Sequence, residues 1–363
     1  MASCYKWTYK NKDIDSELFL RIKEVTGSGI IAGLLINRGI TSPEEAKAFL
    51  NPSEIKISSS DVFEDMPKAV SRIFEAIENQ ERIIIYGDFD ADGVTSTSLL
   101  YKALKHIGAN VGYFIPDRMD EGHGLNKAAV CRLISQEKAK LIITVDCGIS
   151  NVAEVKLAES LGTRVIITDH HEAPEILPPA YATINPKLLD KDPTGLKHLA
   201  GAGVALKLAQ ALLEHAGKPE YLEELIHIAA IGTVGDVVPL LGENRAIVHK
   251  GLELISSKKP ANIAKLMEIA GYKPDKKVTS SMIAFGIVPR LNAVGRLGGA
   301  NPAVEFLVSD DTGEELGEKL DLLIDELERN NKERQQICDE TFKQAVYKIK
   351  QEVNLDRDKA LIL

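Results

Sequence analysis

Short apolar runs alternate with longer amphipathic segments between residues 82 and 184. The runs have the length and composition of buried strands, and the segments between them have the apolar spacing of helices. The predicted strands cover residues 82–86, 111–115, 141–145, 164–168 and, more briefly, 182–184, and the predicted helices cover 95–107, 125–135 and 152–161. Repeated strand–helix units form a parallel sheet with right-handed crossovers. The fold class we expect is therefore α/β, a doubly wound parallel five-stranded sheet.

Additional helical segments flank this alternation. Residues 31–36 are apolar, and Pro43 follows Thr41 and Ser42 as in the first turn of a helix. Apolar segments at 204–215 and 222–231 predict two further helices. A charged stretch at 313–353 carries a thin apolar stripe, typical of a long helix that connects two parts of a protein. The stripe consists of Leu316, Leu320, Leu323 and Leu327.

These patterns divide the chain into five parts. We expect an N-terminal helical and loop extension at 1–60, an α/β domain at 61–250 and a helical subregion that completes it at 251–310. A long C-terminal connector helix follows at 311–355, and residues 356–363 resemble the start of a strand in a further domain.

Composition and charge limit the classes of function that the chain can have. The net charge of −9 and the pI of about 5.5 argue against a protein that coats nucleic acid through its overall charge. A nuclease remains possible, because a local basic groove and an acidic metal site can coexist with an acidic whole. The chain has no apolar run of membrane-spanning length and no signal-peptide core, so we expect a cytoplasmic protein with no membrane contact. Its four cysteines form no CxxC pair, so neither a disulfide framework nor a zinc site is expected.

An acidic loop directly follows the strand predicted at 82–86. It places Asp88, Asp90 and Asp92 within five residues, and these carboxylates would repel one another without a cation. A solvated loop is a poor alternative after an Ile-rich core strand. An EF-hand loop would need a glutamate where Leu99 stands. The loop also resembles the nucleophile motif of haloacid dehalogenases, but that interpretation leaves the next group of residues unexplained.

The next group consists of Asp146, Asp169, His170 and His171, all at predicted strand ends. A single aspartate there is often a turn or cap residue, and a single histidine is more often structural than a ligand. Adjacent residues on an extended chain point in opposite directions, so one imidazole can coordinate a metal while the other faces a phosphate. Asp236 lies at the close of an apolar helix, where it is either a cap or turn residue or a metal ligand.

Together these residues resemble the four motifs of the DHH phosphoesterase superfamily. Further stretches at 86–97, 115–118, 121–126, 201–205 and 289–296 are similar to its bacterial exonucleases specific for single-stranded DNA. One departure is His123, where those exonucleases usually have tyrosine. A larger departure is length, because those proteins continue into a DHH-associated domain and an OB-fold. The Gly-rich motif of the DHH-associated domain is absent from this sequence.

The resemblance implies a two-ion centre. Carboxylates and imidazole suit Mn²⁺ or Mg²⁺. The implied metal ligands are Asp88 and Asp90 for one ion, Asp92, His170 and Asp236 for the other, and Asp146 as the bridge. His171 is expected to stabilise phosphoryl oxygens or the leaving group, which makes Asp146 and His171 the expected catalytic residues. The expected substrate contacts are Arg118, His123, Asn126, Gly201, Gly203, Arg290, Asn292 and Arg296.

The activity implied is 5′→3′ exonucleolytic hydrolysis of single-stranded DNA to 5′-mononucleotides in DNA repair and recombination. Single-stranded DNA, a single-strand DNA-binding protein and a RecQ-type helicase are the implied partners. Three alternatives stay open. The first is a DHH phosphodiesterase for short oligonucleotides or cyclic dinucleotides, or a pyrophosphatase. The second is a non-catalytic scaffold, and the third is a catalytic half that holds metal but cleaves DNA weakly.

Overall fold

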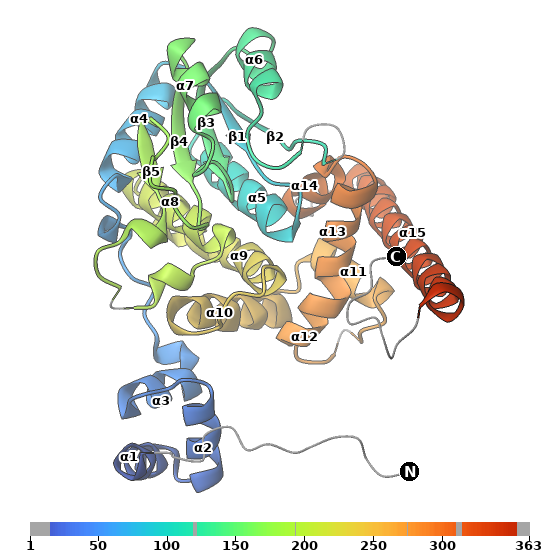
Figure 1. Cartoon of the computed structure of the whole chain (residues 1–363). Helices are drawn as coiled ribbons and strands as arrows, with labels where there is room; N and C mark the ends of the chain where they lie inside the picture. Colours follow the sequence, from blue (N-terminus) through green and yellow to red (C-terminus); the bar gives the residue numbers. More distant parts are fainter. Residues whose placement is uncertain (1–14, 119–121, 193, 274, 310–313, 354–363) are drawn as a thin grey trace.

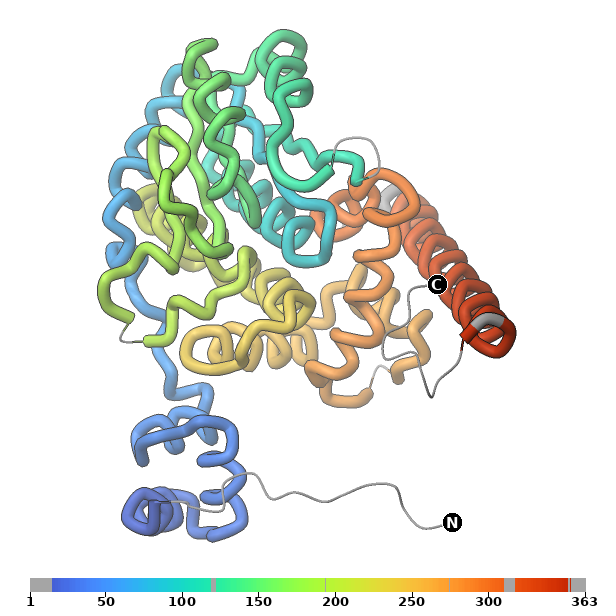
Figure 2. Tube along the Cα trace, in the orientation of Figure 1, coloured from blue at the N-terminus to red at the C-terminus, as the bar shows by residue number. Residues whose placement is uncertain are grey.

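The structure is a computed structural model that describes residues 15–118, 122–192, 194–273, 275–309 and 314–353. Three short helices are followed by a layered α/β unit and then by a helical unit that ends in one long helix (Figure 1). The trace in Figure 2 shows the three parts in the same order along the chain. Among the described residues, no helix is both long and apolar enough to cross a membrane.

Five parallel strands form a single sheet in the order β2-β1-β3-β4-β5. The strands are β1 (Arg82–Tyr86), β2 (Val111–Phe114), β3 (Ala139–Val145), β4 (Arg164–Thr168) and β5 (Ala182–Ile184). The chain moves outward from β1 to β2 and then returns to β3 on the other side of β1. This reversal creates a switch point at the carboxyl ends of β1 and β3, where open α/β sheets bind their ligands. The five-stranded parallel α/β fold predicted from the sequence is confirmed.

Helices cover both faces of the sheet, because alternate strand residues point to opposite sides. Ile83 and Ile85 of β1 are buried in the same core as residues of α4, α5 and α8. Ile84 and Tyr86 are buried on the other face, in the core that contains residues of α6 and α7. These helices are α4 (Met66–Glu78), α5 (Ala91–His106), α6 (Lys127–Ser135), α7 (Val152–Ser160) and α8 (Gly201–His215).

A second core unites the remaining helices with the loop after β1. Phe89 from that loop is buried in the same cluster as residues of α13, α14 and α15. The predicted apolar stripe is confirmed at Leu320, Leu323 and Leu327, which are buried. The helices are α9 (Glu223–Gly235), α10 (Gly242–Lys258), α11 (Ala261–Ile269), α12 (Ser280–Met282), α13 (Val288–Leu297), α14 (Asn301–Val308) and α15 (Glu314–Glu352), with a π-helical turn at Ile283–Ile287.

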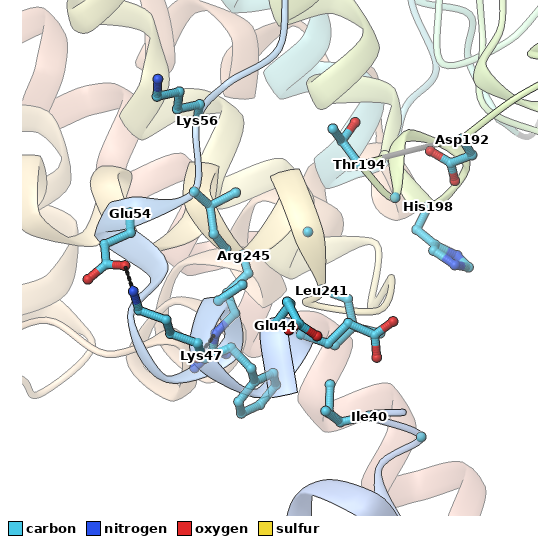
Figure 3. Close-up of a pocket in the computed structure, with 17 residues that line it drawn as sticks. Ile40, Glu44, Lys47, Glu54, Lys56, Asp192, Thr194, His198, Leu241 and Arg245 are labelled. Carbon is cyan, nitrogen blue, oxygen red and sulfur yellow. Dashed lines mark hydrogen bonds and ion pairs between the residues drawn. The ribbon is translucent and has the colours of Figure 1, made fainter. Parts of the chain in front are cut away.

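The N-terminal helices form a small unit of their own, drawn in dark blue in Figure 1. They are α1 (Ser16–Thr26), α2 (Gly29–Asn37) and α3 (Pro43–Leu50), and their small core is built from Ile22, Ala32, Leu35, Ile40 and Ala46. Arg245 of α10 joins this unit to the rest, because its Nε donates to the Phe49 carbonyl at 2.7 Å. A cavity of about 750 Å³ lies at this joint. Figure 3 shows the residues that line it, with Lys47 on one side and Asp192 on the other.

A buried ion pair fixes the linker that follows these helices. Lys207 of α8 and Glu243 of α10 are in direct contact, and both are almost fully buried. Lys207 Nζ also donates to the Ser58 carbonyl at 2.7 Å, and Glu243 Oε2 accepts from Ser58 Oγ at 2.8 Å. The pair therefore ties two helices of the main body to the linker.

Element boundaries differ from the sequence prediction in one place that matters for the site. The helix predicted from residue 95 begins at Ala91, because Asp90 caps it. The strand start predicted at 359–363 lies outside the described residues, and the domain boundaries remain predictions.

Candidate metal centre

Acidic and imidazole groups from four separate stretches converge beyond the carboxyl ends of β1, β3 and β4. Asp88 and Asp90 follow β1, Asp146 directly follows β3, His170 follows β4, and Asp236 caps the C-terminus of α9. Within each of three groups, one ligand atom per residue lies within 4.8 Å of the others. The groups are Asp88–Asp90–Asp146, Asp92–His170–Asp236 and Asp146–His170–His171. Asp146 and His170 each belong to two groups, so the groups form one continuous cluster.

The loop after β1 is shaped by the start of α5. Asp90 Oδ1 accepts from the backbone amides of Asp92 at 2.9 Å and Gly93 at 3.0 Å, which is the usual bonding of a helix cap. A Cβ at Gly93 would lie 2.3 Å from the carbonyl oxygen of Asp88, so only glycine allows this tight turn. The cap leaves the second oxygen of Asp90 free of these two bonds.

Asp92 is held by the N-terminus of a second helix. Its two carboxylate oxygens accept from the amides of Gly201 at 2.6 Å and Ala202 at 2.9 Å, at the start of α8. A Cβ at Gly201 would lie 2.7 Å from the side chain of Asp146, so glycine permits α8 to approach the cluster. The Gly201 amide, predicted as a phosphate contact, thus holds a carboxylate in this structure, and the substrate roles of Gly201 and Gly203 stay predictions.

Asp146 has an unusual backbone. Its φ of 59° is left-handed, a conformation that is uncommon outside glycine and that aspartate and asparagine tolerate better than other residues. The Asp146 amide donates to the Thr168 carbonyl at 3.0 Å, which continues the pairing of β3 with β4 beyond the strand ends. Left-handed residues of this kind are enriched at functional sites, and the Asp146 carboxylate belongs to two of the three groups of ligand atoms.

His170 Nε2 faces the carboxylates of three aspartates. It lies 3.1 Å from Asp146 Oδ1, 3.7 Å from Asp236 Oδ2 and 3.9 Å from Asp92 Oδ2. Burial and the neighbouring His171 lower the pKa of His170 to about 4, so the ring is neutral at physiological pH. A neutral imidazole is the form of histidine that coordinates metal ions, and the carboxylates around His170 Nε2 are further ligands for the same ion.

Burial also disturbs the carboxylates themselves. It raises the pKa of Asp88 to about 6, with the charge of Asp90 as the next cause, and it raises the pKa of Asp236 to about 6 as well. The pKa values of Asp92 and Asp146 are raised further in the same direction, by burial and by neighbouring aspartates. Three buried oxygens accept no hydrogen bond among the described residues: Asp88 Oδ1, Asp146 Oδ1 and Asp236 Oδ2. The donor set fits hard divalent cations, which bind oxygen ligands and neutralise such repulsion.

A second histidine is oriented by Asp169, which belongs to the sequence motif but has no role predicted from it. His171 Nδ1 lies 2.7 Å from Asp169 Oδ1, and this contact raises the pKa of His171. Burial alone would raise the pKa of Asp169, but the bond to His171 and backbone amides, including that of Ile149, lower it overall. Asp169 is thus an anionic acceptor that leaves His171 Nε2 available. The sequence motif contains this aspartate, and the structure shows its role as the partner of His171.

The predicted substrate contacts divide into exposed and internally bonded side chains. Arg118 and His123 are exposed and lie against the Phe89 ring, at 5.2 Å and 4.6 Å from its centroid. Asn126 caps α6, where its Oδ1 accepts from the Ala129 amide at 2.7 Å. Both exposed side chains border the acidic loop.

The remaining three predicted contacts belong to α13. Arg290 is buried, and its Nε donates to Glu328 of α15 at 2.7 Å. Asn292 accepts from the Ala91 amide at 2.7 Å, and Arg296 is exposed. Arg290, Asn292 and Asn126 are thus engaged within the protein, and their role as substrate contacts stays a prediction.

Comparison with known proteins gives consistent results. The model of the DHH family, N-terminal domain, matches residues 82–233, which include every cluster residue except Asp236. The chain is 40% identical over 356 residues to the single-stranded-DNA-specific exonuclease RecJ of Bacillus subtilis, covering 97% of this chain and 43% of that protein. A crystal structure of exonuclease RecJ bound to manganese has 36% identity and a TM-score of 0.70, covering 78% of this chain and 69% of that one.

RecJ of Thermus thermophilus in complex with Mn²⁺ superposes with a TM-score of 0.75 at 32% identity. That match covers 91% of this chain and 46% of the Thermus chain. The chain thus spans less than half the length of the Bacillus relative.

Proposed function

Because the chain belongs to the DHH family and is similar to its RecJ exonucleases, we propose that it hydrolyses phosphodiester bonds of single-stranded DNA with two divalent cations. The observation that carries the proposal is the sharing of Asp146 and His170 among three overlapping groups of ligand atoms. Two neighbouring ions with a common ligand are typical of phosphodiesterases.

We assign the ligands from this grouping. Asp88 and Asp90 would hold one ion, and the second would be held by Asp92, His170 and Asp236. Asp146 would bridge the two ions, because it belongs to one group with Asp88 and Asp90 and to another with His170. Relatives have been crystallised with Mn²⁺ and with Mg²⁺, and either ion suits this donor set.

The ions would supply an acidified water as nucleophile and positive charge beside the phosphate. The protein's own residues orient the reaction. Asp169 holds the His171 ring through Nδ1, so that Nε2 can donate to a phosphoryl oxygen or to the leaving group. The raised pKa of His171 favours the protonated, donating form. The cap at Asp90 and the α8 amides at Asp92 fix two ligands before any ion binds, which is the preorganisation that such a site needs.

Substrate polarity and cellular role form the finer part of the proposal. We infer attack from the 5′ end with release of 5′-mononucleotides, in DNA repair and recombination within the cytoplasm. A single-strand DNA-binding protein and a RecQ-type helicase are the proposed partners. The support for each is the resemblance to RecJ proteins, while Arg118, His123 and Arg296 are exposed side chains that could bind the strand.

Cleavage assays test this function directly. Long single-stranded DNA, the matching duplex and a dinucleotide are incubated with the chain and Mn²⁺, with 5′ or 3′ labels. We expect mononucleotides from the 5′ end of the single strand and no turnover by Asp146→Asn. As a matched control, Asp192→Asn removes an aspartate outside the metal cluster and should keep its activity. Exclusive cleavage of the dinucleotide would replace this function by that of an oligonucleotide phosphodiesterase.

A further inference from the structure

Asn292 reaches from α13 to the backbone of the acidic loop. Its Oδ1 accepts from the Ala91 amide at 2.7 Å, and Ala91 is the residue between two of the proposed metal ligands, Asp90 and Asp92. Ala91 is also the first residue of α5. The contact thus joins residues 201 positions apart at the point where the loop becomes a helix.

The amides at the start of α5 explain why this bond matters. The first amides of any helix have no partner within the helix. Asp90 Oδ1 takes those of Asp92 and Gly93, and the Asp90 carbonyl accepts from Val94. The Ala91 amide is the remaining one, and Asn292 is its acceptor. The bond fixes the peptide plane between Asp90 and Ala91, and with it the directions in which the flanking carboxylates leave the backbone.

Helix α13, which carries Asn292, is held in place by close packing and by hydrogen bonds. A Cβ at Gly295 would lie 2.3 Å from the Phe89 carbonyl oxygen, so α13 and the loop are in close backbone contact. Arg290 anchors the same helix from its other side, through Glu328 of α15 at 2.7 Å and through the Gly286 carbonyl at 2.6 Å. Asn292 is therefore held on a packed element, as the supporting residues of a preorganised site should be.

We propose that Asn292 is a positioning residue, which orients Asp90 and Asp92 for metal binding through the Ala91 amide. This inference rests on the proposed two-ion function. It assigns to Asn292 a role inside the protein, where the sequence resemblance implied a substrate contact. Partners that orient metal ligands typically contribute 10–100-fold to metal affinity.

Mn²⁺ titration calorimetry of Asn292→Ala tests the proposal without using activity. We expect Mn²⁺ to bind roughly 10-fold more weakly or worse. Asn292→Asp keeps an acceptor oxygen and should bind within a few-fold of the wild type. Asn262→Ala is the matched control, because the Asn262 side chain bonds to the Phe306 carbonyl and the Ile263 amide, both in the same helical unit as Asn292. It should lower the melting temperature and leave Mn²⁺ affinity unchanged.

Hydrogen exchange of the backbone amides, measured without metal, gives a second readout. Because no Mn²⁺ is present, the extra negative charge of Asn292→Asp cannot affect it by attracting the ion. The peptide covering residues 87–94 should exchange faster in Asn292→Ala than in the wild type, and Asn292→Asp should restore protection. If Asn292→Ala does not fold, Asn292→Ser, whose hydroxyl stops short of Ala91, takes its place. Unchanged Mn²⁺ affinity in a folded variant lacking the acceptor would overturn the positioning role. Absence of Mn²⁺ binding by the wild type would instead overturn the proposed function.

Discussion

Replacing Asp146 by asparagine should greatly weaken metal binding and still leave the protein folded. In the metal-free protein this carboxylate lies within 4.8 Å of carboxylate oxygens of Asp88 and Asp90. Two unit charges at that distance repel by about 3.5 kcal/mol at an effective dielectric constant of about 20. Proton uptake by the raised-pKa carboxyls relieves part of this repulsion, so we expect Asp146→Asn to gain roughly 1–3 kcal/mol without metal.

The backbone and the neighbours accept the substitution. Asparagine tolerates the left-handed conformation that Asp146 adopts, and its amide can donate to His170 Nε2, which lies 3.1 Å from Asp146 Oδ1. Added metal, in contrast, should stabilise the wild type. A ligand that binds only the folded state at 100 times its Kd stabilises it by about 2.7 kcal/mol. The variant should lose nearly all of that gain.

Thermal unfolding at pH 8, in EDTA and in Mn²⁺, measures both effects. The expected pattern is a melting temperature for Asp146→Asn that is a few degrees higher than that of the wild type in EDTA, with little further rise in Mn²⁺. A variant that is less stable than the wild type in EDTA, yet equally stabilised by Mn²⁺, would refute the reasoning on both counts.

Three further predictions concern other groups. Burial raises the pKa values of Asp88 and Asp236 to about 6, so the stability that each carboxyl contributes in EDTA should be full below pH 4 and be lost as the pH rises through 6, against an opposite contribution from His170, whose pKa burial lowers. The double variant Asp88→Asn, Asp236→Asn isolates the carboxyl contribution: its gain in melting temperature over the wild type should grow between pH 4 and pH 8, and a gain that shrinks contradicts the prediction. Asp169→Asn should lower kcat roughly 100-fold at unchanged Mn²⁺ affinity, because the imidazole that it orients loses its anionic partner; unaltered turnover would exclude this role. Lys207→Met should lower the free energy of unfolding, measured in urea, by about 3–5 kcal/mol, because Glu243 stays buried without its cation. Adding Glu243→Gln should recover much of the loss, and equal stability of the single variant and the wild type would argue against the ion pair.

The strands and the main ligands could be predicted because both depend on local pattern. A parallel strand covered on two faces must be apolar throughout, so a run such as Ile83–Ile84–Ile85 is hard to mistake. The carboxylates follow such runs directly, and the carboxyl ends of parallel strands meet at one edge. The start of α5 was placed four residues late, because a dense acidic loop gives no apolar periodicity to mark a helix.

Contacts between distant segments could not be read from local pattern. The amide of Gly201 bonds to Asp92, which is 109 positions earlier, so a Gly-rich helix start that resembled a phosphate site serves a carboxylate in the structure. Arg290 likewise pairs with Glu328, a partner on a different helix. Residue type and spacing indicated in each case that the group could contact an anion, but only the fold could show which anion it contacts in the protein.

Anomalous scattering at the manganese edge, from crystals soaked in Mn²⁺, tests the central claim most directly. Two peaks about 3.5–4 Å apart are expected, one on either side of the Asp146 carboxylate. One peak should lie against Asp90 and the other against His170 and Asp236. Peaks located elsewhere, or no manganese among these side chains at saturating concentration, would contradict the account.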